Sequence, residues 1–441
     1  MKKRELTKKE FRRAMLCGLG RCVTALKETE NPAKYSDSVL WACTHVISYD
    51  PQCEGTKCYY IRKLIACFDD PAPFFSAIAE GFEKCDLQRK WLFQHYASLL
   101  RLFAAEKNSE ARALLLKKYE QLYASLSDRK RRPRRGIFYE RDAFETLCIE
   151  FVFLGEEEYF RIARDLGRLF LQNKLYSGDD FDWFSWYGKR TYGKRHIDAE
   201  LKKRAKRDAC IAEYARQKAA SEEESRNIKE WSGLEAEQED GTQTLTAVFE
   251  EKDDEKQAEL LSRIRVSSLE KNRKFIAPLL SLTDSKSERV RDSAFEILDE
   301  LKDKAVREFA FELYRKAKTD EEMRSAAICM ILNNYEKEDK EFIFQAVSTL
   351  TFSQDKGWHA VVGKVLSLFE KGGVKNPPKE LLRWIYENSR CSCCRFYAVA
   401  KMSKLRMLTD ELLSECLDDS DEDINVLAVQ KIKNREKERE N

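Results

Sequence analysis

Hydrophobic and polar positions alternate with a helical period over much of the chain, most clearly between residues 284 and 318. Two apolar faces follow one another there, and each is built from residues three or four positions apart, which share one side of a helix. The first face comprises Val290, Ala294, Ile297, Leu298 and Leu301, and the second comprises Val306, Phe309, Ala310, Leu313 and Ala317. Neither short helix can bury its face alone, so we expect the pair to stack on neighbouring pairs.

The same pattern recurs through the C-terminal half. A small residue returns at spacings of 33, 35, 36 and 30 residues, with a polar residue three positions before it. The small residues are Ala294, Ala327, Val362, Ala398 and Ala428, and the polar ones are Arg291, Arg324, His359, Arg395 and Asn425. Capping-box spacing predicts that helices begin after Ser285, Thr319 and Ser420. This pattern resembles the HEAT-repeat family, whose units are helix pairs with a small residue where the helices cross. The resemblance implies an α-solenoid with a surface that binds proteins and, in some members, nucleic acids.

We therefore expect an all-α protein, an α-solenoid of stacked antiparallel helix pairs with an irregular helical N-terminal half. Residues 1–175 form an N-terminal helical domain of degenerate repeats in this prediction. Residues 176–255 hold an aromatic and basic segment, a long polar helix and an acidic linker, and residues 256–437 form the HEAT-like repeats. Only 16 Gly and 8 Pro occur in 441 residues, which favours helices joined by short loops over a sheet protein.

The charge distribution and the cysteine content indicate a class of partner and a cellular compartment. Residues 1–220 carry 43 Lys and Arg against 31 Asp and Glu, whereas residues 221–441 carry 37 against 46. A basic half can attract an anionic partner or the acidic half of its own chain. The 14 cysteines lie mostly on apolar helix faces, which is typical of a reducing compartment. No apolar run resembles a signal peptide or a membrane span, so we expect a cytoplasmic protein without a membrane partner.

One polar turn interrupts the apolar helices near the N-terminus. Asp50 and Pro51 predict a turn, and unusual polarity gathers around it in His45, Tyr49, Asp50, Gln52 and Glu54. These side chains could line a pocket or a peptide-binding notch. Ordinary turn and cap chemistry accounts for the same residue types and is the simpler interpretation.

A second candidate site combines cations with aromatic rings, a composition that suits an anionic partner. Its members are Arg129, Arg131, Arg132, Arg134, Arg135, Trp183, Trp186, Lys189, Arg190, Lys194, Arg195, Lys202, Lys203 and Arg204. Lys and Arg attract phosphates, and exposed rings stack on unpaired bases, so nucleic acid is a candidate partner. In the alternative interpretation the tryptophans fill a helix–helix core and the cations form an ordinary solvated face.

Metal binding and catalysis receive little support. Cys53 and Cys58 with His45 form an irregular set, and so do the cysteines of 391–394 with Cys416. Cys391 and Cys393 are too close together for a structural zinc site, and Cys394 lies next to Arg395 on a predicted packing helix. We therefore expect no metal, no cofactor and no catalytic residue. Some HEAT-like solenoids are DNA glycosylases, and by that resemblance Asp182, Trp183, Trp186 and Arg190 are the nearest residue mix.

These observations predict a non-catalytic helical-repeat scaffold that presents a groove to a protein partner. The alternative is a nucleic-acid-binding protein that uses the basic and aromatic residues of its N-terminal half. If they are exposed, Trp358, Trp384 and Tyr386 are candidate anchors for the partner, although burial is the commoner fate of such rings.

Overall fold

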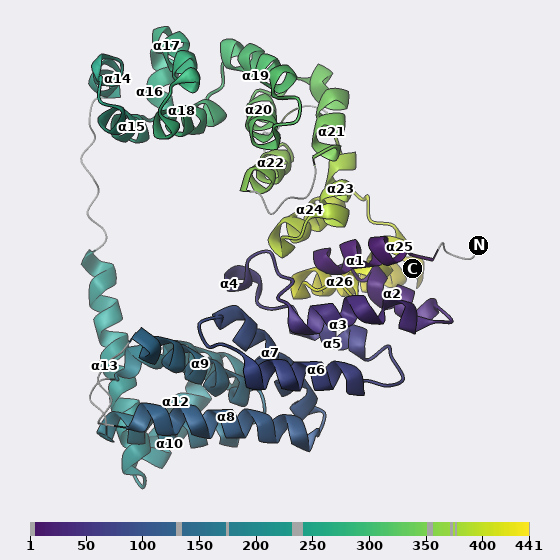
Figure 1. Cartoon of the computed structure of the whole chain (residues 1–441), viewed down its shortest axis with the longest axis vertical. Coiled ribbons are helices and arrows are strands. Elements are labelled where there is room, and N and C mark those ends of the chain that lie inside the picture. Colours follow the sequence, from purple (N-terminus) through teal and green to yellow (C-terminus); the bar gives the residue numbers. More distant parts are fainter. Residues whose placement is uncertain are drawn as a thin grey trace. The chain divides into compact units, whose positions relative to one another are not determined.

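The computed structural model describes residues 5–128, 135–172, 176–231, 241–350, 356–370, 374 and 377–440 (Figure 1). Within these ranges every regular element is a helix and none is a strand, which confirms the all-α prediction. None of the described helices has the length and the apolar run needed to cross a bilayer. Packing divides the chain into two compact units. Unit 1 comprises Met1–Glu235 and Ser414–Val426, and unit 2 comprises Ala236–Leu413 and Leu427–Asn441.

Unit 1 begins with short helices and continues with longer ones, drawn from purple to teal in Figure 1. Its helices are α1 (Lys8–Cys17), α2 (Arg21–Glu28), α3 (Ser36–Thr44), α4 (Pro51–Glu54), α5 (Cys58–Ile65), α6 (Ala72–Lys84), α7 (Lys90–Ala105), α8 (Ser109–Ser127), α9 (Arg135–Val152), α10 (Glu156–Gln172), α11 (Asp182–Tyr192), α12 (Lys194–Ala205) and α13 (Ala209–Trp231). Two 3₁₀ turns, η1 (Pro32–Tyr35) and η2 (Gly178–Phe181), precede α3 and α11.

Helix α8 illustrates how the sequence forms these elements. The Asn108 side chain accepts a hydrogen bond from the backbone N–H of Ala111 at 2.9 Å, which satisfies a donor left free at the helix start. Apolar residues then recur at helical spacing and are buried on the side that faces α7 and α9: Ala111, Leu115, Tyr119, Leu122 and Leu126. The buried face is the one that this spacing in the sequence predicts.

The C-terminal segment of unit 1, residues 414–426, is held on the first helices of the chain. The backbone N–H of Ser420 donates to the carbonyl oxygen of Gly18 at 2.8 Å, and Arg21 forms an ion pair with Glu415 at 2.7 Å. A Cβ atom at Gly20 would lie 1.9 Å from the Glu415 carbonyl oxygen. The close approach of the two backbones therefore requires glycine at this position.

Unit 2 contains the segments in which the repeat pattern is clearest. Its helices are α14 (Gly241–Glu250), α15 (Asp254–Ser262), α16 (Val266–Lys271), α17 (Ile276–Ser281), α18 (Glu288–Glu300), α19 (Lys304–Ala317), α20 (Glu321–Asn333), α21 (Lys340–Ser348), α22 (Lys356–Ser367), α23 (Glu380–Asn388) and α24 (Ser392–Lys404). Helices α25 (Asp410–Cys416) and α26 (Glu422–Glu440) each belong partly to unit 2. The 3₁₀ turns are η3 (Arg273–Phe275), η4 (Leu282–Asp284) and η5 (Lys337–Asp339).

The small residues of the sequence pattern share one environment in the structure, and the polar residues do so in part. All five small residues at the predicted crossings are 0% exposed. The polar residue three positions earlier bonds the preceding turn in three of the repeats. Arg291, Arg395 and Asn425 each donate to the carbonyl oxygen six residues before them, at 2.9, 3.4 and 3.1 Å. These bonds satisfy carbonyl groups that the turn leaves without a helical partner.

The predicted helix caps are wrong in register. Helix α20 is capped by Asp320 and α26 by Asp421, whose carboxylates accept backbone N–H groups at 3.1 and 3.0 Å. The prediction placed these caps one residue earlier, at Thr319 and Ser420. Near Ser285, α18 begins without a side-chain cap. Where a hydroxyl and a carboxylate are neighbours, either can cap a helix, so spacing alone does not decide between them.

Candidate functional site

The polar turn at residues 45–54 is organised by local bonds. The His45 ring stacks on Trp41 with centroids 4.4 Å apart, and its Nδ1 lies 3.0 Å from the Trp41 carbonyl oxygen. Asp50 caps α4 by accepting the backbone N–H of Gln52 at 2.9 Å. Hydrogen bonds from Cys53 and then Gln52 lower the pKa of Asp50. Tyr49 is half-buried beside it.

Below this turn lies a layer of buried polar groups. Glu54 and Lys57 form an ion pair at 3.1 Å, and each side chain is 1% exposed. His95 is fully buried, and its Nε2 lies 3.0 Å from the carbonyl oxygen of Ala42. Burial lowers the pKa of His95 to about 4, so the imidazole is neutral at physiological pH. The His95 contact joins α7 to α3, and the Glu54–Lys57 pair joins α4 to the start of α5.

The predicted basic and aromatic set is divided by the structure. Arg129, Arg131, Arg132 and Arg134 lie outside the described residues, and so does the side chain of Arg135 at the start of α9. The remaining members lie on two consecutive helices. Helix α11 carries Trp183, Trp186, Lys189 and Arg190, and α12 carries Lys194, Arg195, Lys202, Lys203 and Arg204.

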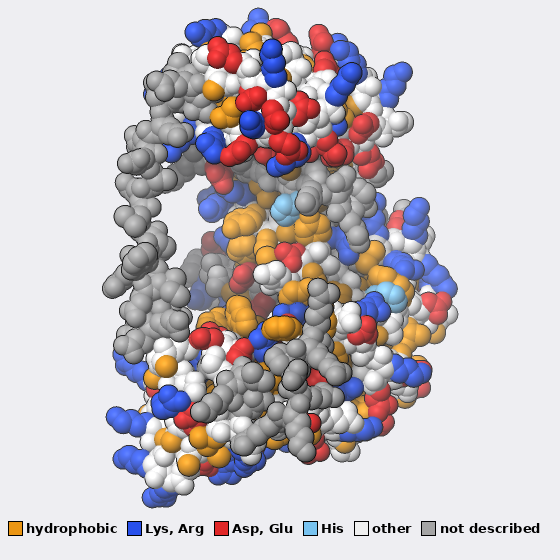
Figure 2. All heavy atoms as spheres, turned by 60° about the vertical axis from the view of Figure 1, so that its left-hand side comes forward, with side chains coloured by type: hydrophobic (Ala, Val, Ile, Leu, Met, Phe, Trp, Pro, Cys, Tyr) orange, Lys and Arg blue, Asp and Glu red, His pale blue; other side chains and the backbone are white. Residues whose placement is uncertain are grey.

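Several cations of this set are paired with carboxylates of the same unit. Lys189 lies 3.1 Å from Asp198, and Lys203 lies 3.0 Å from Glu200. Arg204 donates through both terminal nitrogens to the two carboxylate oxygens of Glu157, at 3.0 and 2.6 Å. Figure 2 shows Lys and Arg side chains interspersed with Asp and Glu on the face that it presents. Internal pairing therefore offsets part of the positive charge of α11 and α12.

The tryptophans of α11 belong to a continuous surface feature, which we call the aromatic strip. It consists of the rings of Tyr59, Phe153, Tyr187, Trp186 and Trp183 with the guanidinium groups of Arg101 and Arg190. Successive members are in contact from Tyr59 through Arg101, Phe153, Tyr187 and Trp186 to Trp183, at centroid separations of 4.9, 5.2, 5.6, 4.8 and 5.9 Å. Arg190 lies 4.9 Å above the Trp186 ring. The strip thus joins residues from α5, α7, the end of α9 and α11.

The tryptophans of the strip are solvent-exposed, which overturns their interpretation as a core plug, whereas Arg101 in its middle is buried. Trp183 and Trp186 are 59% and 44% exposed, and Tyr59 is 63% exposed. Phe184, between the tryptophans, is the residue of that segment that enters the core, at 0% exposure. Helix α11 therefore turns its apolar face inward through Phe184 and leaves both indole rings on the surface.

A buried ion pair supports the middle of the strip. Arg101 donates to Glu150 at 3.1 Å, and the two side chains are 7% and 6% exposed. The Ser98 hydroxyl donates to the other carboxylate oxygen of Glu150. Because the guanidinium is fixed by this pair, it forms a rigid bridge between the Tyr59 and Phe153 rings.

Two carboxylates hold the start of α11, which carries the tryptophans. Glu145 accepts the backbone N–H of Trp183 at 3.1 Å, and burial raises the pKa of Glu145 to about 7. Asp182 pairs with the buried Lys218 and lies 3.4 Å from the Ser221 hydroxyl. The carboxylate at the place suggested by the glycosylase resemblance is thus engaged in bonds to α13.

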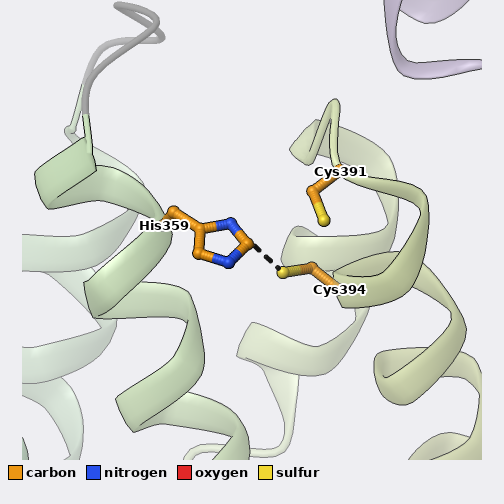
Figure 3. A group of neighbouring side chains, drawn as sticks. All are labelled: His359, Cys391 and Cys394. Atoms are coloured by element: carbon orange, nitrogen blue, oxygen red, sulfur yellow. Dashed lines mark hydrogen bonds between the residues drawn. The ribbon is translucent and has the colours of Figure 1, made fainter. Parts of the chain in front are cut away.

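A third group of side chains lies in unit 2, and sequence reasoning missed it. His359 on α22 faces Cys391 and Cys394 at the start of α24 (Figure 3). The ligand atoms all lie within 4.8 Å of one another. Both thiols are buried, and the imidazole is half-buried. The sequence pattern predicts a packing role for Cys394, but the pair that meets His359 is Cys391 and Cys394, which has Cys-x2-Cys spacing.

The chemistry of this group differs from that of the other buried thiols. The pKa of the Cys391 thiol is lowered to about 4, chiefly by a hydrogen bond from Cys394, against the effect of burial. His359 and the backbone N–H of Cys394 lower it further. Burial is the main cause of the raised pKa of Cys22 and Cys43. These three side chains could therefore hold a metal ion that prefers thiolate and imidazole ligands.

The rings proposed as groove anchors in the C-terminal half are not surface features. Trp358 is 7% exposed and Tyr386 is 0% exposed. Trp384 is half-buried, and its ring lies 5.9 Å from that of Trp358. Apolar rings at helical spacing are core residues here because α22 and α23 pack on each other.

Comparisons with protein-family models, curated proteins and solved structures find no match to this chain. Function is therefore inferred from the geometry of the described residues.

Proposed function

We propose that the protein is a non-catalytic scaffold, an α-solenoid of HEAT-like helix pairs that binds a polypeptide partner. The observation that carries this proposal is the aromatic strip of unit 1. The solenoid part is supported by the buried small residues at 33- to 36-residue and 30-residue spacings and by the shared bonds from Arg291, Arg395 and Asn425 to their preceding turns.

The strip has the properties of a binding surface rather than of a solvated exterior. The exposed rings of Trp183 and Trp186 are in contact with each other and, through Tyr187, with Phe153, and connected apolar areas of this kind are typical of interaction sites. Trp, Tyr and Arg are also the residues that most often dominate the binding energy of an interface. Ring contacts and the Arg101–Glu150 pair already restrict these side chains, so binding costs little additional side-chain entropy.

The residue types of the strip also indicate which side chains a partner segment would carry. The exposed faces of Trp183 and Tyr59 would be covered by apolar side chains. Arg190, fixed above the Trp186 ring, has N–H groups that can donate to a carboxylate. We therefore propose a segment of polypeptide that carries apolar side chains next to an Asp or Glu.

Single-stranded nucleic acid is a second candidate, favoured by the same stacking surface beside the cations of α12. It ranks second because Lys189, Lys203 and Arg204 are already paired with carboxylates. A phosphate backbone would have to compete with those pairs, which reduces the gain from counterion release.

Selection from a displayed library of random peptides on the full-length protein tests the proposal. Enriched peptides should combine apolar residues with Asp or Glu. The Trp183→Ala/Trp186→Ala variant should bind them at least roughly 30-fold more weakly, because a dominant interface ring contributes about 2 kcal/mol or more. A Tyr397→Ala variant is the control, since Tyr397 is 56% exposed but lies in unit 2.

Equal binding of the selected peptides to wild type and to the double tryptophan variant would refute the proposed role of the strip. An oligo(dT) probe addresses the second candidate in the same assay. Tight binding of oligo(dT) that falls steeply with salt and requires the tryptophans, without enrichment of any peptide, would favour nucleic acid instead.

A further inference from the structure

The group formed by His359, Cys391 and Cys394 has no part in the aromatic strip and lies in the other unit. Figure 3 shows the imidazole of α22 and the two thiols of α24 pointing toward one another. From this geometry we infer that the three side chains form a zinc site that joins α22 to α24. The site has three protein ligands and a fourth position for water or an external ligand.

The separation of the ligand atoms suits a zinc ion. Bonds of about 2.3 Å to sulfur and about 2.0–2.1 Å to nitrogen place two tetrahedral ligands roughly 3.6 Å apart. The Cys394 Sγ lies 3.7 Å from the His359 Nδ1, and the Cys391 Sγ is within 4.8 Å of both atoms. A tetrahedral set requires rotation of the thiol side chains toward the ion. Thiolate and imidazole ligands together select zinc over magnesium or calcium.

The local structure of α24 presents both thiols to one point. Cys391 directly precedes the helix and Cys394 lies in its first turn, the placement that Cys-x2-Cys spacing gives in structural zinc sites. Arg395, which is 0% exposed, donates to the carbonyl oxygens of Ser389 and Arg390 at 3.4 Å each. These bonds fix the turn that leads into Cys391. Since His359 is only half-buried, the ion has a route from solvent.

His359 differs in chemistry from the residues at the equivalent positions of the repeat pattern. In three repeats the equivalent residue is Arg291, Arg395 or Asn425, and it bonds the turn of its own repeat. At position 359 the side chain is an imidazole, and its Nδ1 lies against Cys394 in the next repeat. A zinc ion there would link two neighbouring repeats and stabilise unit 2, because binding to the folded state alone raises its stability.

Cobalt titration of the reduced full-length protein tests the inference without depending on a variant. One equivalent of Co²⁺ should give the thiolate-to-metal charge-transfer absorption and the intense visible bands of a tetrahedral site, and Zn²⁺ should displace both. Zinc should also raise the melting temperature of the wild-type protein. The Cys394→Ser and His359→Ala variants should each bind cobalt more than roughly 100-fold more weakly, since loss of a direct ligand exceeds the effect of outer partners.

Cys393→Ser is the matched control, because Cys393 is exposed and lies between the two ligands in sequence. It should retain the cobalt spectrum and its affinity. Circular dichroism of each variant establishes that the helices are intact. An octahedral spectrum without thiolate bands would overturn the inference, as would equal losses in Cys393→Ser and Cys394→Ser. So would a Cys391–Cys394 disulfide that, after reduction, leaves a dithiol unable to take up cobalt.

Discussion

Replacing Arg101 with Met tests whether the buried Arg101–Glu150 ion pair stabilises the helices that carry the aromatic strip. The Arg101 guanidinium donates to Glu150 at 3.1 Å, with 7% and 6% of the two side chains exposed. The substitution keeps most of the aliphatic volume but removes the charge. Glu150 then keeps the hydroxyl of Ser98 as a hydrogen-bond donor and loses its counterion.

The expected cost is large because the remaining carboxylate cannot reach water. Breaking one side of a buried pair costs about 3–5 kcal/mol, since an uncompensated charge stays in a medium of low dielectric constant. Replacing both partners with apolar residues of similar size is often close to neutral. Arg101→Met should therefore destabilise unit 1 far more than Arg101→Met/Glu150→Leu.

Hydrogen exchange of the full-length protein measures this effect locally. Peptides from α7 and α9 should exchange roughly 150- to 5,000-fold faster in Arg101→Met, the factor that corresponds to about 3–5 kcal/mol. Peptides from α20, which lies in unit 2, serve as the internal control. If the double variant were destabilised by the sum of the two single variants, the charge pair would not be the cause, and this explanation of the strip's rigidity would be refuted.

Two further predictions concern single positions. Burial raises the pKa of Glu145 from 4.5 to about 7, so the folded state holds its proton between these pH values. The stability that this provides is complete below about pH 4.5 and is lost as the pH rises through about 7. Chemical denaturation should show a loss on the order of 2 kcal/mol, after allowance for screening, that Glu145→Gln lacks. At Gly167 a Cβ atom would lie 1.7 Å from the Cys210 carbonyl oxygen, so Gly167→Ala should cost about 3 kcal/mol or more. Gly363→Ala, which meets nothing within 4 Å, should instead gain about 0.5–1 kcal/mol in the same denaturation experiment. A flat pH profile in wild type, or equal effects at the two glycines, would contradict these arguments.

The burial of the small residues could be predicted from the sequence because a helix crossing constrains residue size. Ala294, Ala327 and Ala398 are small for that reason, and all are fully buried. The aromatic strip could not be predicted in the same way. Its members Tyr59 and Phe153 are far apart in sequence, and an aromatic residue at helical spacing is usually buried. Only the packing of α5, α7 and α9 shows that these rings reach the surface together.

The group formed by His359, Cys391 and Cys394 could have been found from the sequence with the help of the repeat pattern. Aligned repeats predict the type of side chain at each position. A residue of different chemistry at one of these positions therefore indicates a different role. His359 is such a residue among Arg291, Arg395 and Asn425, because an imidazole is a metal ligand and a guanidinium is not. Cys391 and Cys394 lie at the start of the next helix of the pattern, and in a solenoid adjacent repeats touch. The two observations together place an imidazole against a Cys-x2-Cys pair from the sequence alone. A residue that departs from a repeat pattern is therefore best compared with the residues of the neighbouring repeat, since a binding site can be formed by side chains from two adjacent repeats.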